Sequence, residues 1–515
     1  MRNQLKAGAV LSYVSLFLNS VISIIYTPIM LNLLGQSEYG LYSLAASTAG
    51  YVGILNFGLG NAVIRYIAKC RALNDEDGCS RLYGMFFIMY GVLGVLALIG
   101  GTILTLKSHL FFGNSLSIEE LTKIKILMGI MTINLSVGIG LGMFSVVVLA
   151  HDRFIVQKLI VIATSIFNPF IMLPLLLMGY GSIAMAVVTT VLNFVSIIVN
   201  LYYCFRVLRI KIVFKKFESS LLKEILIFSF YIFINLIIGK LYGTTDQLIL
   251  GIYSGTVAVS IYTIGNTFTG YFSGFSSAIS NVFLGKVSGM VSKEVTEGEL
   301  SNLFIRIGRV QYIILSFTLS GFIVFGQEFI NLWVGKDYRD SFIIALLILI
   351  PLIFSLVQEM GGVILQAKNR QKFKTLISFG IAVMNVILSV IFVQWWGAIG
   401  CAIATAISMI IGKIIIINIY YWKKIKIDIP RFWKNIILMS FPLALCVVFG
   451  TTLNKLIFAE SWWFLGFKMV VFSTVFLLLM WFTGMNAYEK DLLIQPFKKM
   501  ARRLPVKRVM WHKNG

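Results

Sequence analysis

The chain has 515 residues, of which 58% are hydrophobic and only 13% are charged, and its formal net charge is +23. Because soluble domains contain about 25% charged residues, this composition excludes an ordinary soluble protein and predicts an integral membrane protein. The excess of Lys and Arg fits either nucleic-acid binding or retention of basic loops in the cytoplasm, and the positions of these residues distinguish the two.

Fourteen apolar stretches follow one another along the chain, each with the roughly 20 residues that a helix needs to cross the hydrocarbon core. The first, which follows Lys6, is much longer than the apolar part of a cleavable signal peptide, so it is predicted to span the membrane. Turn signals at 179–182 and 253–256 divide two longer apolar runs. The predicted spans are residues 8–34, 40–64, 82–105, 126–149, 158–179, 182–205, 224–252, 256–285, 303–326, 341–366, 374–394, 398–421, 435–456 and 463–483.

Basic residues sort to one side of this topology when the N-terminus is placed in the cytoplasm. Most of the 44 Lys and Arg residues fall in the loops after the second, sixth, eighth, tenth and twelfth spans and in the C-terminal segment. The loops on the other side are short and nearly free of basic residues. This is the positive-inside pattern, so we predict that both termini are cytoplasmic and that the chain binds no nucleic acid.

An internal repeat recurs at an offset of about 220 residues, as is common in transporters. Leu41–Ser43 corresponds to Ile261–Thr263, and Gly181–Ile183 corresponds to Gly397–Ile399. The repeat predicts an all-α polytopic membrane protein with about fourteen transmembrane helices. Its predicted parts are two six-helix lobes at residues 1–216 and 217–428, an appended helix pair at 429–485, and a basic cytoplasmic tail at 486–515.

Cysteine and histidine usage indicates neither redox nor metal chemistry. The five cysteines, Cys70 and Cys79 among them, are too few and too scattered for a disulfide framework, and the three histidines do not form a metal cluster. We therefore expect no disulfide framework, no metal and no bound cofactor.

Four segments resemble the polysaccharide transporter (Wzx-type flippase) family of the multidrug/oligosaccharidyl-lipid/polysaccharide exporter superfamily. They are LLGQSEYGLYSL at 33–44, GLGNAVIRYIAK at 58–69, TDQLILGIYSG with VSIYTIGNTF at 245–268, and GAIGCAIATAIS at 397–408. The resemblance implies two helical bundles around a cavity that opens alternately to each face. It also implies export of undecaprenyl-pyrophosphate-linked sugars across the bacterial cytoplasmic (inner) membrane. The extra helix pair after the repeat favours this lipid-substrate branch over the twelve-helix multidrug branch.

Lys413 is the strongest candidate for substrate binding. It lies ten residues before Lys423, which places it roughly 15 Å from the cytoplasmic boundary of its span at 1.5 Å per residue. Ionisable residues at such depth are costly and are functional candidates by default, and an ammonium group could bind the pyrophosphate of a lipid-linked sugar. Alternatively, Lys413 pairs with the carboxylate of Glu359 at a similar depth and holds its lobe together.

Lys240 and Asp246 share the seventh span and are also candidates. Six residues correspond to about 600° on a regular helix, which places these two side chains some 120° apart, so a direct pair would need a distortion such as one at Gly243. In the resemblance, Asp246 belongs to a DxxxLG-like element, and a structural role at the outer helix end is the stronger alternative. The long side chain of Lys240 could instead reach water.

Three arginines lie where spans meet the cytoplasm. Arg65 lies where the GLGNAVIRYIAK segment leaves the membrane, and Arg306 and Arg309 lie where the ninth span enters it. They could form a basic vestibule that recruits pyrophosphate from the inner leaflet. The alternative is that the positive-inside rule alone explains them, and this alternative is stronger for Arg306 and Arg309.

The energy source is predicted to be something other than ATP, because no G-x-x-x-x-G-K-[ST] loop occurs. The membrane potential drives anions outward by about 2.3 kcal/mol per charge per 100 mV, and coupling to H⁺ or Na⁺ stays open.

Two other functions are alternatives to lipid-linked oligosaccharide export. A cation-coupled multidrug exporter would use an acidic residue in the first lobe, whose spans have none. A membrane enzyme of glycan assembly would need a nucleophile and a base, which the loop at 106–125 lacks. The expected partners are an anionic lipid-linked oligosaccharide, membrane lipids and other glycan-assembly proteins.

Overall fold

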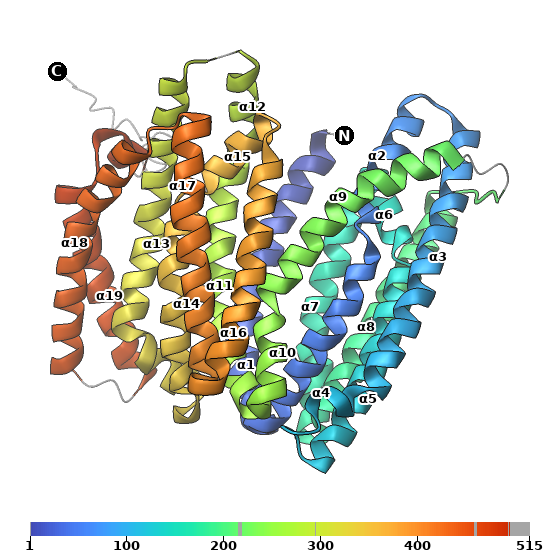
Figure 1. Ribbon diagram of the computed structural model, residues 1–515, viewed down its shortest axis with the longest axis horizontal. Coiled ribbons are helices and arrows are strands. Elements are labelled where there is room, and N and C mark those ends of the chain that lie inside the picture. Colours follow the sequence, from blue (N-terminus) through green and yellow to red (C-terminus); the bar gives the residue numbers. More distant parts are fainter. Residues whose placement is uncertain (1, 215–218, 294, 458–460, 493, 495–515) are drawn as a thin grey trace, which may run out of the picture. The chain divides into compact units, whose positions relative to one another are not determined.

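The computed structural model describes residues 2–214, 219–293, 295–457, 461–492 and 494 (Figure 1). Within these residues nearly every segment is helical and no strand occurs. A helix satisfies its own backbone N–H and C=O groups, which hydrocarbon cannot do, so long apolar runs fold in this way. The predicted all-α class is confirmed. Most of the predicted tail at 486–515 lies outside the described residues.

Eleven helical stretches among the described residues are long and apolar enough to cross a membrane. Two of them, Val14–Ala72 and Gln371–Ile425, each contain two of the predicted spans. The eighth predicted span corresponds to helix α11 (Gly255–Val282), which is not among the eleven. The chain is therefore a multi-pass membrane protein, whereas the number fourteen stays a prediction.

Two glycines allow the chain to reverse inside what is otherwise continuous helix. α16 (Gln371–Met409) turns at Gly397, whose φ of 53° is unfavourable for residues with a side chain. The Asn385 amide Nδ2 donates to Thr405 Oγ1 at 2.8 Å, although these residues would lie about 30 Å apart on a straight helix. α16 is therefore a helical hairpin. α1 (Arg2–Val52) turns back in the same way at Gly35, where φ is 78° (Figure 1).

The reversals recur at the spacing of the predicted repeat. Gly35 and Gly255 have φ values of 78° and 80°, and Gly181 and Gly397 have values of 62° and 53°. Each pair occupies corresponding positions in the two copies, so the repeat extends from sequence to backbone conformation. The division into lobes at residues 216, 428 and 485 stays a prediction.

The chain packs into two compact units. Unit 1 comprises the described residues of Met1–Tyr271, Trp333–Pro351 and Lys372–Lys413, and unit 2 those of Phe272–Leu332, Leu352–Gln371 and Ile414–Gly515. Besides α1, α11 and α16, the helices that lie mainly in unit 1 are α2 (Leu59–Ala72), α3 (Glu76–Leu106), α4 (Ser108–Phe112), α5 (Ile118–Gly140), α6 (Met143–Ala150), α7 (Phe154–Leu177), α8 (Gly181–Tyr202), α9 (Ser219–Gly243), α10 (Thr245–Tyr253) and α14 (Asp340–Leu356). Those of unit 2 are α12 (Leu284–Ser292), α13 (Glu297–Trp333), α15 (Glu359–Ala367), α17 (Ile417–Tyr420), α18 (Ile429–Leu456) and α19 (Trp462–Leu479).

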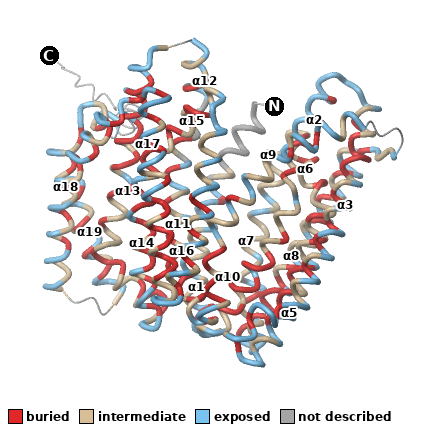
Figure 2. The backbone as a smooth tube through the Cα atoms, in the orientation of Figure 1, coloured by how far each residue is buried: buried red, intermediate tan, exposed pale blue. Residues whose placement is uncertain are grey.

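Helix α3 shows how unit 1 is adapted to lipid. Buried and exposed residues alternate along it (Figure 2), and its exposed residues include Ile88, Val92, Val95, Ile99 and Ile103, which follow the helical period. Its packed face has small residues at the closest approach to α5, where a Cβ built on Gly94 would lie 2.8 Å from the Cα of Gly140. Exposed apolar side chains and small residues at helix contacts are typical of a protein embedded in lipid.

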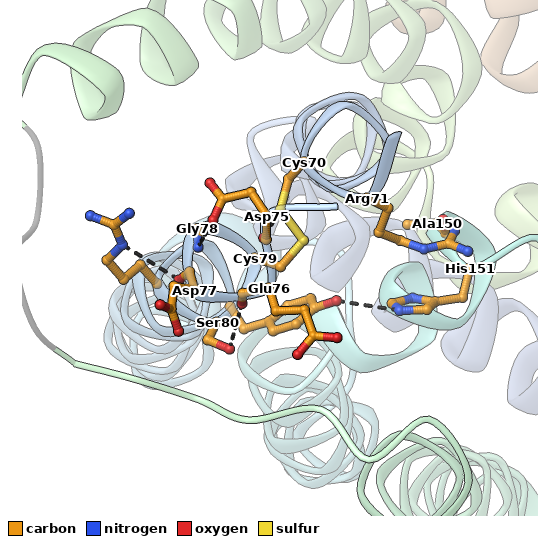
Figure 3. The surroundings of a disulfide bond; sticks show 12 residues. Cys70, Arg71, Asp75, Glu76, Asp77, Gly78, Cys79, Ser80, Ala150 and His151 are labelled. Carbon is orange, nitrogen blue, oxygen red and sulfur yellow. Dashed lines mark hydrogen bonds between the residues drawn. A yellow bond between two sulfur atoms is a disulfide. The ribbon is translucent and has the colours of Figure 1, made fainter. Parts of the chain in front are cut away.

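Cys70 and Cys79 form a disulfide bond, with their Cα atoms 5.7 Å apart (Figure 3). The sequence predicted no disulfide framework, and it did not indicate this single bond. Cys70 lies in the last turn of α2 and Cys79 in the first turn of α3, and the short turn between these helices brings them together. Asp75 caps α3 by accepting a hydrogen bond from the backbone N–H of Gly78 at 2.8 Å.

Candidate functional site

Lys413 lies on a wide, π-helical turn (Ile410–Ile416) that follows the hairpin of α16. Its Nζ is 4.5 Å from the centroid of the Tyr242 ring on α9, and the lysine is half-buried. The turn packs tightly, because a Cβ on the neighbouring Gly412 would lie 2.0 Å from Ile381 Cγ1. π-Helical turns are frequent at functional sites, and a cation over an aromatic face is attracted by the ring quadrupole. Lys413 is thus positioned by two packed helices.

Lys240 occupies the other side of α9. Two residues correspond to about 200° around a helix, so Lys240 and Tyr242 project in nearly opposite directions. A Cβ built on Gly50 of α1 would lie 2.9 Å from Lys240 Nζ, so the absence of a side chain at Gly50 makes room for this ammonium group. The structure places Lys240 and Lys413 on either side of one helix, with α9 between their charged ends.

Asp246 is 4% exposed and accepts three hydrogen bonds from hydroxyl groups. Its carboxylate receives Tyr262 from α11 at 2.6 Å, and Ser389 and Thr405 from the two arms of α16 at 2.7 and 2.8 Å. Its neighbour Gln247 bonds to Ser47 of α1 and Thr263 of α11. Asp246 therefore joins three helical segments of the second predicted repeat, and Gln247 adds a contact with α1 of the first. The helix is interrupted between Lys240 and Asp246, because α9 ends at Gly243 and α10 begins at Thr245. This break between the helices accompanies the hydroxyl contacts of Asp246. Within the described residues no ion pair joins Asp246 to Lys240.

Three further residues predicted from the sequence, Arg65, Glu359 and Arg306, lie in other parts of the structure than the lysines described above. Arg65 is exposed on α2, with its guanidinium carbon 4.9 Å from the Phe228 ring centroid. Glu359 is the first residue of α15 in unit 2, whereas Lys413 belongs to unit 1, so their pairing stays a prediction. Arg306 is exposed, and its guanidinium carbon lies 3.0 Å from the Tyr488 ring centroid.

Arg309 is largely satisfied by protein groups. Its Nε and Nη2 donate to the two carboxylate oxygens of Glu489 at 2.6 and 2.9 Å. Nη1 donates to Asn435 Oδ1 at 3.2 Å, and Nη2 also donates to the Gly484 carbonyl at 2.9 Å. A bidentate, buried arginine of this kind joins α13 to α18 and to the segment that follows α19. The vestibule role expected for Arg309 stays a prediction, and its contacts are those of a residue that holds helices together.

Sequence reasoning missed a buried lysine. Lys468 is completely buried on α19 and donates to Glu328 Oε2 at 2.6 Å and to the Ile457 carbonyl at 3.1 Å, with Asn454 as a further partner. A signal for it existed, because Lys468 lies inside the predicted span 463–483. With Arg309 and Glu489, it gives α18 and α19 two buried charged links to α13, so the appended helices are an integral part of unit 2.

A network of polar side chains, here called the polar junction, lies at the end of unit 1 that the predicted topology places outside the cell. Glu120 Oε1 accepts from Ser37 at 2.6 Å and from Thr256 at 2.8 Å, and Glu38 bonds to Ser182 and Lys123. This junction joins the turn of α1 to the start of α11. The two predicted repeats are therefore in contact at this end in the structure.

Gly40 allows the closest approach at this junction, because a Cβ on Gly40 would lie 1.9 Å from the backbone oxygen of Thr256. We expect Gly40→Ala to lower the stability of the purified protein by about 1–3 kcal/mol, the usual cost of overpacking. A thermal melt monitored by size-exclusion chromatography in detergent would measure this. Gly91→Ala is the matched control, because nothing lies within 4 Å of that position. Equal melting temperatures for the wild type and Gly40→Ala would contradict the tight packing.

Together these features give unit 1 two half-buried ammonium groups, one fully hydrogen-bonded carboxylate and a closed polar junction. The ammonium groups can bind an anion, and the carboxylate can bind a proton or a cation. No group of three or more His, Cys, Asp or Glu side chains that could hold a metal occurs in the described part of the chain.

The chain is similar to curated proteins from two organisms. A curated relative from Shigella flexneri, named "Putative O-antigen transporter", is 23% identical over 397 residues, which cover 75% of this chain and 90% of that protein. Another, from Haloferax volcanii, is named "Probable low-salt glycan biosynthesis flippase Agl15". It is 24% identical over 287 residues, which cover 54% of this chain and 57% of that protein.

Solved structures show the same fold at low sequence identity. Lipid II flippase MurJ in an inward closed conformation superposes with a TM-score of 0.72 at 15% identity, covering 95% of this chain and 99% of that chain. An inward-facing multidrug resistance MATE family transporter of the MOP superfamily gives 0.64 at 16% identity, covering 82% and 99%. The family described as "Polysaccharide biosynthesis protein" matches residues 5–284, which is more than half of the chain. The chain therefore belongs to the polysaccharide biosynthesis protein family.

Proposed function

We propose that the protein is an alternating-access flippase for a lipid-linked oligosaccharide. Its substrate would be an undecaprenyl-pyrophosphate-linked repeat unit of O-antigen, capsule or exopolysaccharide, moved from the inner to the outer leaflet of a bacterial cytoplasmic membrane. Both termini would be cytoplasmic, and other glycan-assembly proteins would supply and consume the repeat unit. The names of the two curated relatives support this proposal, since one is a transporter of O-antigen and the other a flippase of glycan biosynthesis.

The observation that carries the proposal is the position of Lys413 on its π-helical turn, over the ring of Tyr242. A charged side chain at the centre of a spanning helix costs about 2.5–3.5 kcal/mol on insertion scales. A ligand of opposite charge is a reason to retain it, and a pyrophosphate is such a ligand. The ammonium of Lys240 on the other side of α9 would offer a second, separate cation to an anionic head group.

The driving force would come from the membrane potential and a coupled cation. An inside-negative potential favours outward movement of a pyrophosphate anion without ATP. The Asp246 carboxylate, its three hydroxyl neighbours and Asn385 Oδ1 supply the hard oxygen atoms that a proton or a sodium ion requires. Asn385 is 1% exposed, and its Oδ1 accepts no hydrogen bond from the described residues. We assign this oxygen cluster as the coupling site.

Deletion of the gene tests the function. We expect lipid-linked repeat units to accumulate on the inner leaflet and the surface glycan to disappear, with recovery of both when the gene is restored. Susceptibility to cationic drugs should not change. Normal surface glycan together with increased drug susceptibility would replace the proposal with the multidrug exporter. The enzyme alternative predicts loss of the lipid-linked intermediate itself, which mass spectrometry of extracted lipids would show.

A further inference from the structure

The disulfide between α2 and α3 (Figure 3) contributes one cysteine to each of two cavities of unit 1. Cys70 lines a cavity of about 210 Å³ together with Lys69 and Arg81, and Cys79 lines a second one of about 530 Å³. Each cysteine is only 7% exposed, but each borders a space that a small molecule can enter. A thiol reagent could therefore reach either sulfur without unfolding of the helices.

The predicted topology places this turn in the cytoplasm. It follows the second span, and basic residues on both sides of it contribute to the positive-inside pattern. Cytosolic thiols are kept reduced by glutathione and thioredoxin, so disulfides found there are usually transient. A permanent structural bond is therefore not expected at this position, whereas a pair that opens and closes is.

The larger cavity has the charge that an anionic reagent would need. Arg71, Arg209 and Lys211 line it together with Asp75 and Glu76, so that basic side chains are in excess. Arg71 is held by the Ala150 carbonyl at 2.6 Å and lies 3.5 Å from Asp152. The lining therefore offers Arg209 and Lys211 to the carboxylates of a low-molecular-weight disulfide such as that of glutathione.

We infer that Cys70 and Cys79 are a redox-active pair that a small cytoplasmic disulfide closes and cytoplasmic thiols reopen. In closing, the thiolate of one cysteine attacks the small disulfide, whose S–S bond breaks and releases one small thiol. The second cysteine then attacks the mixed disulfide and releases the other small thiol. Two electrons pass from the protein to the reagent, and the two cysteine protons go to the released thiols.

Closure holds the end of α2 against the start of α3. α2 carries Arg65 and Tyr66, and the Tyr66 hydroxyl donates to Glu224 of α9 at 2.8 Å. Tyr66 also lines the same cavity as Cys70. The redox state of the pair would therefore restrain the helix that presents Arg65, independently of which molecule the protein transports.

Differential alkylation in intact cells tests the inference. Cells expressing the full chain are treated with diamide, with dithiothreitol or with neither, then quenched in acid and labelled with N-ethylmaleimide after denaturation. Peptide mass spectrometry reads the two sites. We expect both cysteines to be labelled in untreated and reduced cells. After diamide we expect at least a fivefold loss of label and a peptide pair linked through its sulfurs. Cys204, which is buried, is the internal control and should be labelled in all three samples.

Two results would overturn the inference. A linked pair in untreated cells would show a permanent structural bond, and full labelling after diamide would show that the pair does not close. In the Cys70→Ser variant, Cys79 has no partner cysteine with which to form the internal disulfide. If Cys79 still loses its N-ethylmaleimide label after diamide, its peptide should carry the added mass of a mixed disulfide with a small thiol. All these measurements are independent of transport. The redox inference can therefore be wrong while the flippase proposal is right, and the flippase proposal can be wrong while the redox inference is right.

Discussion

Replacing Lys413 by alanine is expected to reduce export of the lipid-linked sugar at least tenfold at normal protein abundance. Hydrogen bonds to charged groups contribute about 1.5–3 kcal/mol, and each 1.4 kcal/mol corresponds to a factor of ten. Lys413→Arg keeps the positive charge and the interaction with the Tyr242 ring, so it should retain a substantial part of the activity. Export is measured as accessibility of the sugar to a glycosidase added outside proteoliposomes that contain the purified protein.

The matched control is Lys423→Ala, because Lys423 is an exposed lysine of the same chain segment near the predicted cytoplasmic boundary. It should leave export unchanged. Undiminished export by Lys413→Ala would remove Lys413 from the binding site. If the role of Lys413 is to pair with Glu359, then Glu359→Gln should cause an equal loss and the double variant no further loss. A ligand role predicts that Glu359→Gln is milder than Lys413→Ala.

Substitution of Asp246 is expected to have the second large effect, and two variants separate its structural role from coupling. Asp246→Ala removes the shared acceptor of Tyr262, Ser389 and Thr405. Three buried hydroxyls without an acceptor should destabilise the protein by about 3 kcal/mol or more, since each unsatisfied group costs about 1–3 kcal/mol. The thermal melting temperature in detergent measures this loss.

Asp246→Asn keeps the shape and one acceptor oxygen but removes the charge. We expect this variant to fold, with a smaller loss of stability than Asp246→Ala, and to lose the acceleration that an imposed proton or sodium gradient gives to transport in proteoliposomes. Ser341→Ala is the control, because it deletes one buried hydroxyl donor, which bonds to the Ile261 carbonyl at 2.7 Å, and leaves the oxygen atoms around Asp246 in place. If Asp246→Asn transports with an unchanged gradient dependence, Asp246 has only a structural role.

The membrane fold was predictable because it depends on local composition. Apolar runs long enough to cross the bilayer must form helices there, and the repeat at Tyr42 and Tyr262 is visible in the letters alone. Gly35 and Gly397 fall in the gaps between predicted spans, and Gly181 and Gly255 fall within the predicted turn signals. The number of spans is harder to establish, since a span such as α11 contains many polar residues and falls outside the eleven strongly apolar stretches.

The candidate site was predictable only as a set of separate residues. Lys413, Lys240 and Asp246 were identified by their depth in the membrane, because depth follows directly from the number of residues between a position and the end of its span. Their partners were not visible. Tyr242 and Gly50 have no unusual feature in sequence, and the hydroxyls around Asp246 come from residues up to 159 positions away. Lys468 was overlooked although it lies within a predicted span.

The sequence by itself determined that this protein is a helical, multi-pass membrane protein with an internal repeat, because hydrophobic length and the cost of unpaired backbone groups in lipid act on each segment separately. Only the tertiary structure decided which charges are satisfied. Arg309 and Lys468 are neutralised by Glu489 and Glu328, Asp246 is surrounded by hydroxyls, and Lys413 lies against an aromatic ring. The energy of a buried charge depends on atoms within a few ångströms, and helices distant in sequence supply those atoms.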